Sequence, residues 1–247
     1  MDTIPSARRA AVMRKTPAAL ILLALVFAVL MAPTPTLAVP MTSVLTIQPA
    51  LRVVPYKAEA VFWGELTDEF LDPVDGYAVQ FQRSLDNAVW QTVEEVPSIP
   101  EPLYSRQYEA RYALTRAAWF RFSFAGDDIW APSFSQGVRV KPRVSLTTPI
   151  APKVVRARRA FTAYGYLKPR HASGAVYVKI RCYRKSSSGA WVLKKIFGAR
   201  DVNYRTYTKY RARVSLPKTG QWRLTARYSG TTKFAKTDSG ARYLRAR

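Results

Sequence analysis

Apolar and polar residues alternate with a period of two along much of the chain after residue 40. The alternation is clearest over residues 176–183 and 210–216, where every second side chain is apolar. Successive side chains of a strand point to opposite faces, so this pattern predicts strands with one buried face. The 3.6-residue period of an amphipathic helix does not appear beyond residue 40. We therefore predict an all-β fold.

Short turn signals separate these alternating runs. They are Asp86-Asn87, Ser188-Gly189, Lys218-Thr219-Gly220 and Ser229-Gly230. Runs of roughly five to nine residues between such turns are typical of an antiparallel β-sandwich. We predict strands A, B, C, C′, E, F and G, in the order that such a sandwich uses.

An internal repeat divides the chain after its N-terminal segment. Residues 60–66 recur as residues 161–167, and Trp90 recurs as Trp191 at the same shift of 101 positions. The shift grows slowly toward the C-terminus, as small insertions in turns would produce. We therefore predict two domains, residues 39–142 and 143–247, joined at Pro142 without a flexible Gly/Ser spacer.

The first 38 residues have the features of a secretory signal peptide. Basic residues between Arg8 and Lys15 precede an apolar run over residues 18–32, which is followed by proline and small residues up to Ala38. The run is shorter than the roughly 20 apolar residues of a transmembrane helix. We predict cleavage after Ala38 and a mature chain with no integral membrane domain, which would be secreted and extracellular or associated with the cell wall. An uncleaved N-terminal anchor is the alternative.

Several segments of the second repeat resemble a known family. Residues 165–171, 178–184, 189–191, 207–212 and 220–226 are similar to Ig-like repeats of secreted proteins from high-GC Gram-positive bacteria. Residues 39–142 look like a sister repeat. The resemblance implies two tandem Ig-like antiparallel β-sandwiches after an N-terminal signal peptide helix. It also implies an accessory or adhesive role, without a named target.

The composition argues against an enzyme. The chain has one His, His171, and one Cys, Cys182. A Ser/His/Asp triad would need an acid beside His171, and none is near in sequence; a structural zinc site needs more His or Cys ligands than are present. We expect His171 to be a solvated turn residue and Cys182 to be a small buried hydrophobe. No small-molecule substrate and no organic cofactor are predicted.

Carboxylates gather in two loops of the first domain. They are Asp68, Glu69, Asp72, Asp75, Asp127 and Asp128. The B–C and F–G loops of an Ig-like sandwich lie at the same end, so these residues are expected to form an acidic tip. Calcium prefers such oxygen ligands, although the spacing lacks an EF-hand pattern. We retain a calcium site as the alternative to a solvated acidic loop.

Charge is the strongest compositional signal. Residues 39–142 hold 9 Lys and Arg against 13 Asp and Glu, whereas residues 143–247 hold 26 against 2. Self-repulsion at this density favours a polyanionic partner. Strand parity predicts a binding surface of cations and aromatics on one sheet: Lys179, Arg181, Arg223, Arg227, Tyr177 and Tyr183. Anionic cell-wall or other extracellular polymers are the predicted partners.

Other functions follow from other features. Trp90, Trp191 and Trp222 are predicted to be core residues. Trp63 and Trp119 are predicted either to face solvent and to form a sugar-stacking surface, or to be buried at the domain junction. A carbohydrate-binding or structural accessory module is therefore an alternative, as is a protein–protein interaction module. The opposite charges of the two domains also suggest head-to-tail self-association.

Overall fold

The computed structural model describes residues 39–99, 106–172 and 177–247. The predicted signal peptide, residues 1–38, lies outside the described residues. Residues from Pro40 to Arg247 belong to one compact unit. In the described part of the chain, no helix has the length and apolar character needed to cross a membrane.

The first repeat forms short strands that pair into sheets. They are β1 (Ser43–Leu45), β2 (Gln48–Pro49), β3 (Val53–Pro55), β4 (Glu59–Gly64), β5 (Leu66–Asp68), β6 (Val79–Ser84), β7 (Trp90–Val96), β8 (Tyr108–Ala113), β9 (Ala118–Phe124), β10 (Ser133–Phe134) and β11 (Val138–Arg143). One sheet has the order β3-β11-β9-β6-β7, with β10 beside β9, and another has the order β2-β4-β8. The short strands β1 and β5 pair with each other.

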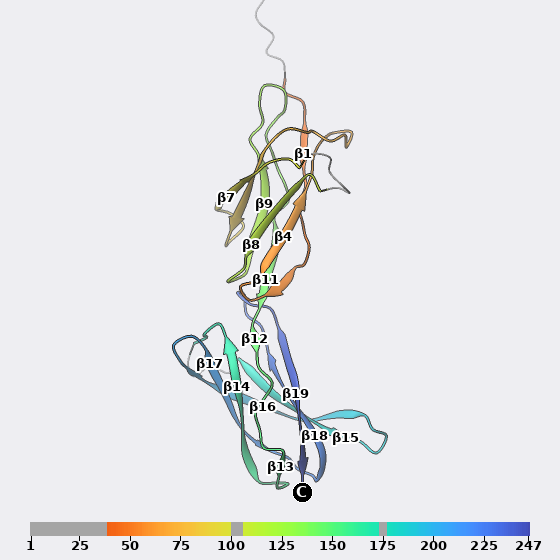
Figure 1. Ribbon diagram of the computed structural model, residues 1–247, viewed down its shortest axis with the longest axis vertical. Helices are drawn as coiled ribbons and strands as arrows, with labels where there is room; N and C mark the ends of the chain where they lie inside the picture. The colour runs from red at the N-terminus through yellow and green to blue at the C-terminus, as the bar shows by residue number, and fades with distance from the viewer. Residues whose placement is uncertain (1–38, 100–105, 173–176) are drawn as a thin grey trace, which may run out of the picture. The chain divides into compact units, whose positions relative to one another are not determined.

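The second repeat has longer strands. They are β12 (Ser145–Leu146), β13 (Val154–Val155), β14 (Ala160–Lys168), β15 (Val178–Lys185), β16 (Trp191–Asn203), β17 (Thr208–Ser215), β18 (Gly220–Tyr228) and β19 (Thr237–Ala246). Their order is β12-β14-β17-β16-β15-β18-β19-β13. The long strand β16 crosses from one sheet of the sandwich to the other (Figure 1). Its first part pairs with β15, and its last four residues pair with β17.

Each repeat has its own hydrophobic core. One cluster of buried residues includes Phe62, Phe81 and Phe120, and the other includes Tyr210 and Trp222. The inward positions are those that the period-two pattern assigned to the buried face. In β15, for example, the burial pattern alternates along the strand, because side chains of a sandwich point alternately to the core and to solvent.

The predicted fold class is confirmed: the described chain is all-β and forms Ig-like β-sandwiches. Among the strands that the structure describes, the pairings are antiparallel except for two short ones. In each repeat a piece of the first strand crosses over and runs parallel to the last strand, as β3 does beside β11 and β13 beside β19. Period-two alternation cannot predict this exchange, since both sheets of a sandwich require the same alternation.

Candidate functional site

The predicted cationic residues of β15 and β18 lie on one outer face of the second sandwich. Lys179 is opposite Arg227 in the strand register, and Tyr183 is opposite Arg223. Arg181 lies between them, opposite Thr225. The residues between them in β15 are buried in the core. Alternation therefore places five of the six predicted residues on the same surface.

Arg223 lies at the centre of this face. Its Cζ atom is 4.6 Å from the centre of the Tyr183 ring and 5.4 Å from that of Trp191. The Trp191 and Tyr243 rings are 5.5 Å apart between centroids. We call this surface the Arg223 platform, and it consists of Lys179, Arg181, Tyr183, Trp191, Arg223 and Tyr243. Stacking on the rings holds the guanidinium group in place and leaves its charge uncompensated.

The platform cations find few partners within the protein. The Nε atoms of Arg181 and Arg223 are buried, and they have no hydrogen-bond partner among the described residues. Beside the platform is a hollow of about 380 Å³ that is lined by Trp191, Tyr243 and Lys153 among others. This surface combines aromatic rings, cations and a hollow. Such a combination can bind a ligand in which an anionic group is attached to a ring or to a polymer chain.

Two of the predicted residues do not belong to the platform. Arg227 donates two hydrogen bonds to the Asp238 carboxylate, at 2.5 and 2.7 Å, and these bonds hold the pKa of Asp238 below its usual range. Its charge is therefore already neutralised. Tyr177 packs instead against the rings of His171 and Tyr228, at centroid distances of 5.2 and 6.3 Å. It lies just before β15 begins, where the outward alternation of that strand no longer applies.

Trp191 and Tyr243 were missed as platform residues. Trp191 was predicted to be a core residue, as was Trp90, but both are only half-buried; of the three tryptophans assigned to the core, Trp222 is buried. A register shift between Cys182 and Tyr183 adds a residue to β16, and Trp191 comes to lie opposite Lys185 on the outer face. The outward position of Tyr243 was predictable from the sequence, because side chains alternate along a strand and its neighbour Leu244 points inward.

The single His and the single Cys are both structural. The prediction of a solvated His171 is wrong: its ring is partly buried and contacts Tyr177, Tyr228 and Phe234. The Nδ1 atom lies 2.7 Å from the Pro169 carbonyl, and Nε2 lies 2.9 Å from the Tyr228 hydroxyl. Burial lowers the pKa of His171, which favours the neutral ring. Cys182 is buried as predicted, and burial raises the pKa of its thiol to about 12.

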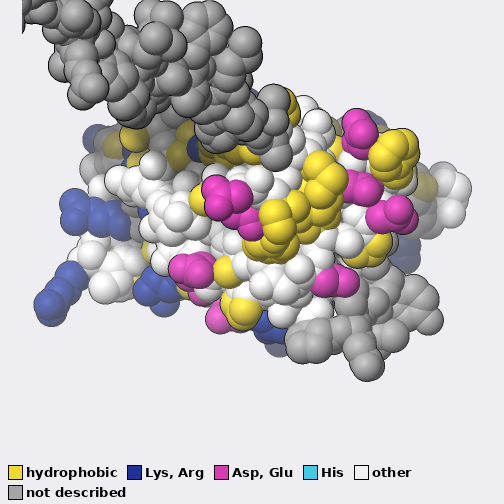
Figure 2. All heavy atoms as spheres, turned by 90° about the horizontal axis from the view of Figure 1, so that it is seen from above, with side chains coloured by type: hydrophobic (Ala, Val, Ile, Leu, Met, Phe, Trp, Pro, Cys, Tyr) yellow, Lys and Arg dark blue, Asp and Glu magenta, His cyan; other side chains and the backbone are white. Residues whose placement is uncertain are grey.

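The acidic loops of the first domain use their carboxylates locally. Asp68 accepts hydrogen bonds from the backbone N–H groups of Phe70 and Asp72, and Asp127 accepts them from Ile129 and Trp130. Asp and Glu side chains alternate with exposed apolar ones on the face drawn in Figure 2. Within the described ranges, no group of three or more His, Cys, Asp or Glu side chains is arranged to hold a metal ion. The geometry therefore adds nothing in favour of a calcium site.

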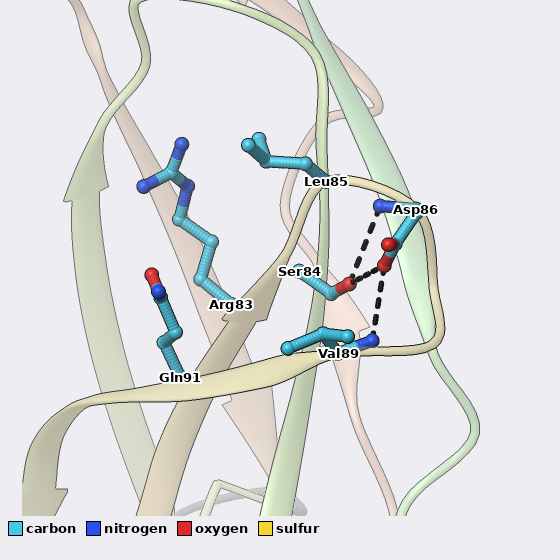
Figure 3. A pocket seen from close by; sticks show the side chains of 6 residues that line it. All are labelled: Arg83, Ser84, Leu85, Asp86, Val89 and Gln91. Carbon is cyan, nitrogen blue, oxygen red and sulfur yellow. Dashed lines mark hydrogen bonds between the residues drawn. The ribbon is translucent and has the colours of Figure 1, made fainter.

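A small hollow of about 130 Å³ lies at the hairpin between β6 and β7 (Figure 3). Its carboxylate, Asp86, accepts hydrogen bonds from the Ser84 hydroxyl and from the backbone N–H groups of Ala88 and Val89. The backbone bonds lower the pKa of Asp86 to about 2. This carboxylate is therefore a turn cap, and it is not aimed at a ligand.

The two tryptophans that were predicted to face solvent are half-buried, and an arginine covers each one. The Arg106 guanidinium carbon is 4.1 Å from the Trp63 ring centre, and that of Arg139 is 5.7 Å from the Trp119 ring centre. A sugar that stacked on the same ring face would have to displace the arginine. These rings are therefore weaker candidates for sugar stacking than Trp191 and Tyr243.

No protein-family model matches this chain, and no curated protein matches it. Among solved structures, it is similar to the ICAM-5 D1–D4 ectodomain fragment, with 10% sequence identity and a TM-score of 0.44. The match covers 83% of this chain and 53% of that one, so this chain spans about half of the ICAM-5 fragment. The fold assignment rests on the strand pairings described above.

Proposed function

We propose that this protein is an exported, non-enzymatic binding module that holds anionic cell-envelope polymers on the Arg223 platform. The observation that carries the proposal is the aromatic stacking of Arg223 in a half of the chain with 26 cationic and two acidic residues. Of those two acids, Asp238 is bonded to Arg227 and Asp201 is buried. Lys179, Arg181 and Arg223 therefore retain charge that an external anion can neutralise.

A phosphate-bearing polymer suits this surface best among anionic chains. A guanidinium group can donate two parallel hydrogen bonds to a phosphate, and the rings of Tyr183 and Trp191 offer apolar contact to the units between phosphates. The half-buried His171 and the thiol of Cys182 are both engaged in packing, so neither of them lies beside the cations on this face. Binding without turnover is the chemistry that these residues favour.

Binding to purified wall polymer at several salt concentrations tests this proposal. The double variant Arg181→Gln/Arg223→Gln is expected to bind about 10-fold more weakly at low salt than the unaltered protein. The slope of log affinity against log salt should fall by about 1.4, since each phosphate contact contributes roughly 0.7 for a single-stranded polyanion. The fluorescence of Trp191 should change on binding, because its ring lies beside Arg223.

The control variant is Lys218→Gln/Arg247→Gln, which removes the same charge at exposed positions outside the platform. It should keep most of the affinity. Equal losses in both double variants would show that net charge acts without a site and would contradict the platform. Binding that does not change with salt would instead favour a neutral carbohydrate stacked on Trp191 and Tyr243.

A further inference from the structure

The opposite sheet of the second sandwich carries its own row of cations on its outer face. Arg211 of β17 lies directly opposite Arg200 of β16 and, on its other side, opposite Tyr164 of β14. Arg213 is two residues further along β17, so it is on the same face. All three arginines are exposed. They line a hollow of about 720 Å³ together with Thr162 and its neighbours.

This arrangement is unfavourable for the sandwich alone. Like charges directly opposite each other on paired strands destabilise a sheet. The acid Asp238 forms its ion pair with Arg227, on the other sheet. Asp201 also borders the hollow, but only 1% of its surface is exposed. Its two neighbours in β16 face outward, so strand alternation turns the Asp201 side chain toward the core. An anion in the hollow would relieve the repulsion of the three arginines.

Four tyrosines extend from the same arginines along the face. The Tyr164 and Tyr166 rings are 6.2 Å apart, Tyr166 and Tyr207 are 5.3 Å apart, and Tyr207 and Tyr204 are stacked at 4.9 Å. The Nζ atom of Lys209 lies 4.4 Å from the centre of the Tyr164 ring. Cations beside a continuous row of rings are what a chain with alternating phosphates and less polar units would contact.

We propose that this outer face of β14, β17 and β16, which we call the Arg211 face, is a second binding site for a phosphate-bearing polymer. The inference rests on the proposed function of the Arg223 platform. It adds that one domain holds two polymer segments, because the outer faces of the two sheets of a sandwich point in opposite directions. A protein with two such faces cross-links polymer chains, and cross-linking strengthens its own retention.

The experiment compares four proteins. They are the unaltered mature chain, the platform variant Arg181→Gln/Arg223→Gln, the Arg211-face variant Arg200→Gln/Arg211→Gln/Arg213→Gln, and the control Lys218→Gln/Lys233→Gln/Arg247→Gln, whose substituted side chains are exposed and lie outside both faces. Calorimetry with inorganic tripolyphosphate counts the sites. Light scattering with long-chain inorganic polyphosphate measures cross-linking, and circular dichroism confirms that each variant is folded.

The unaltered protein and the control are expected to bind two tripolyphosphate ions and to scatter strongly with the long polymer. The Arg211-face variant should lose one of the two sites and the scattering, while it keeps the other site. If it retains both sites and scatters like the control, the Arg211 face is not a binding site. A single site that only the platform variant removes would uphold the proposed function and overturn this inference. A single site that only the Arg211-face variant removes would support the Arg211 face and overturn the proposed role of the Arg223 platform. No binding by the unaltered protein would overturn both proposals.

Discussion

Replacing Gly165 by Ala is expected to destabilise the second sandwich by about 3 kcal/mol. A Cβ atom at this position would lie 2.2 Å from the Tyr210 hydroxyl oxygen and 2.3 Å from the ring carbon that bears it. Tyr210 is fully buried, and its hydroxyl donates a hydrogen bond of 2.7 Å to the Thr147 carbonyl. The ring must move, so the variant loses this bond, at about 1 kcal/mol, and gains overpacking strain of about 2 kcal/mol.

Urea denaturation of the double variant Gly165→Ala/Tyr210→Leu tests whether the tyrosine is the cause. In the Tyr210→Leu background, adding Gly165→Ala should cost less than 1 kcal/mol, because leucine leaves the space that the new methyl group needs. An equal cost in both backgrounds would place the penalty elsewhere in β14. The coupling free energy from this cycle measures the Gly165 and Tyr210 contact directly.

A glycine is paired with a buried tyrosine at the corresponding place in both repeats. Gly64 is paired with Tyr108 across β4 and β8, as Gly165 is paired with Tyr210 across β14 and β17. The tyrosines donate to the carbonyls of Tyr77 and Thr147. In the first repeat, however, a Cβ atom at Gly64 would lie nearest to the Thr46 carbonyl oxygen and the Phe122 ring, and not to Tyr108. The spacing of the repeat predicted the two sets of strands from these residues, but not which strands would be partners.

Prediction of the candidate site succeeded where it depended on alternation within one strand. Lys179, Arg181 and Tyr183 share a face because they are two residues apart, and this needs no knowledge of the fold. It failed where a neighbouring strand decides the outcome. The partner of Arg227 comes from β19, and the position of Trp191 depends on an irregularity in the pairing of β15 with β16.

The Arg211 face was not predicted for a related reason. Arg200 belongs to a strand whose first part pairs in one sheet and whose last residues pair in the other. A pattern of alternating residues does not show where a strand changes sheets, since both halves continue the same alternation. Arg200 and Arg211 are brought together only by that change. Clusters built from two strands therefore need the register as well as the sequence.

Replacing Asp201 by Asn is expected to stabilise the protein at pH 7 by about 3 kcal/mol. Asp201 is 1% exposed, and burial raises its pKa to about 6, while the backbone N–H of Tyr177 lowers it by a smaller amount. In the unfolded chain the same carboxyl has a pKa of about 3.9. The folded state therefore binds more protons between pH 4 and pH 6, and folding loses stability as the pH rises through this window. A difference of about two pKa units corresponds to about 3 kcal/mol.

Thermal unfolding of the Asp201→Asn variant and the unaltered protein between pH 3 and pH 8 measures this effect. The two melting temperatures should converge near pH 3, where Asp201 is mostly protonated in both states, and separate up to about pH 7. Asp238→Asn is the matched control with the opposite sign: the Arg227 hydrogen bonds lower the pKa of Asp238, so this variant should lose stability at pH 7 and little at pH 3. A gap between Asp201→Asn and the unaltered protein that is constant with pH would mean that the charge of Asp201 is not its cause. A gap in melting temperature that closes on acidification would show that the buried Asp201 carboxylate destabilises the folded protein. This carboxylate lies beside the exposed arginines of the Arg211 face, in the half of the chain that we propose binds polymer.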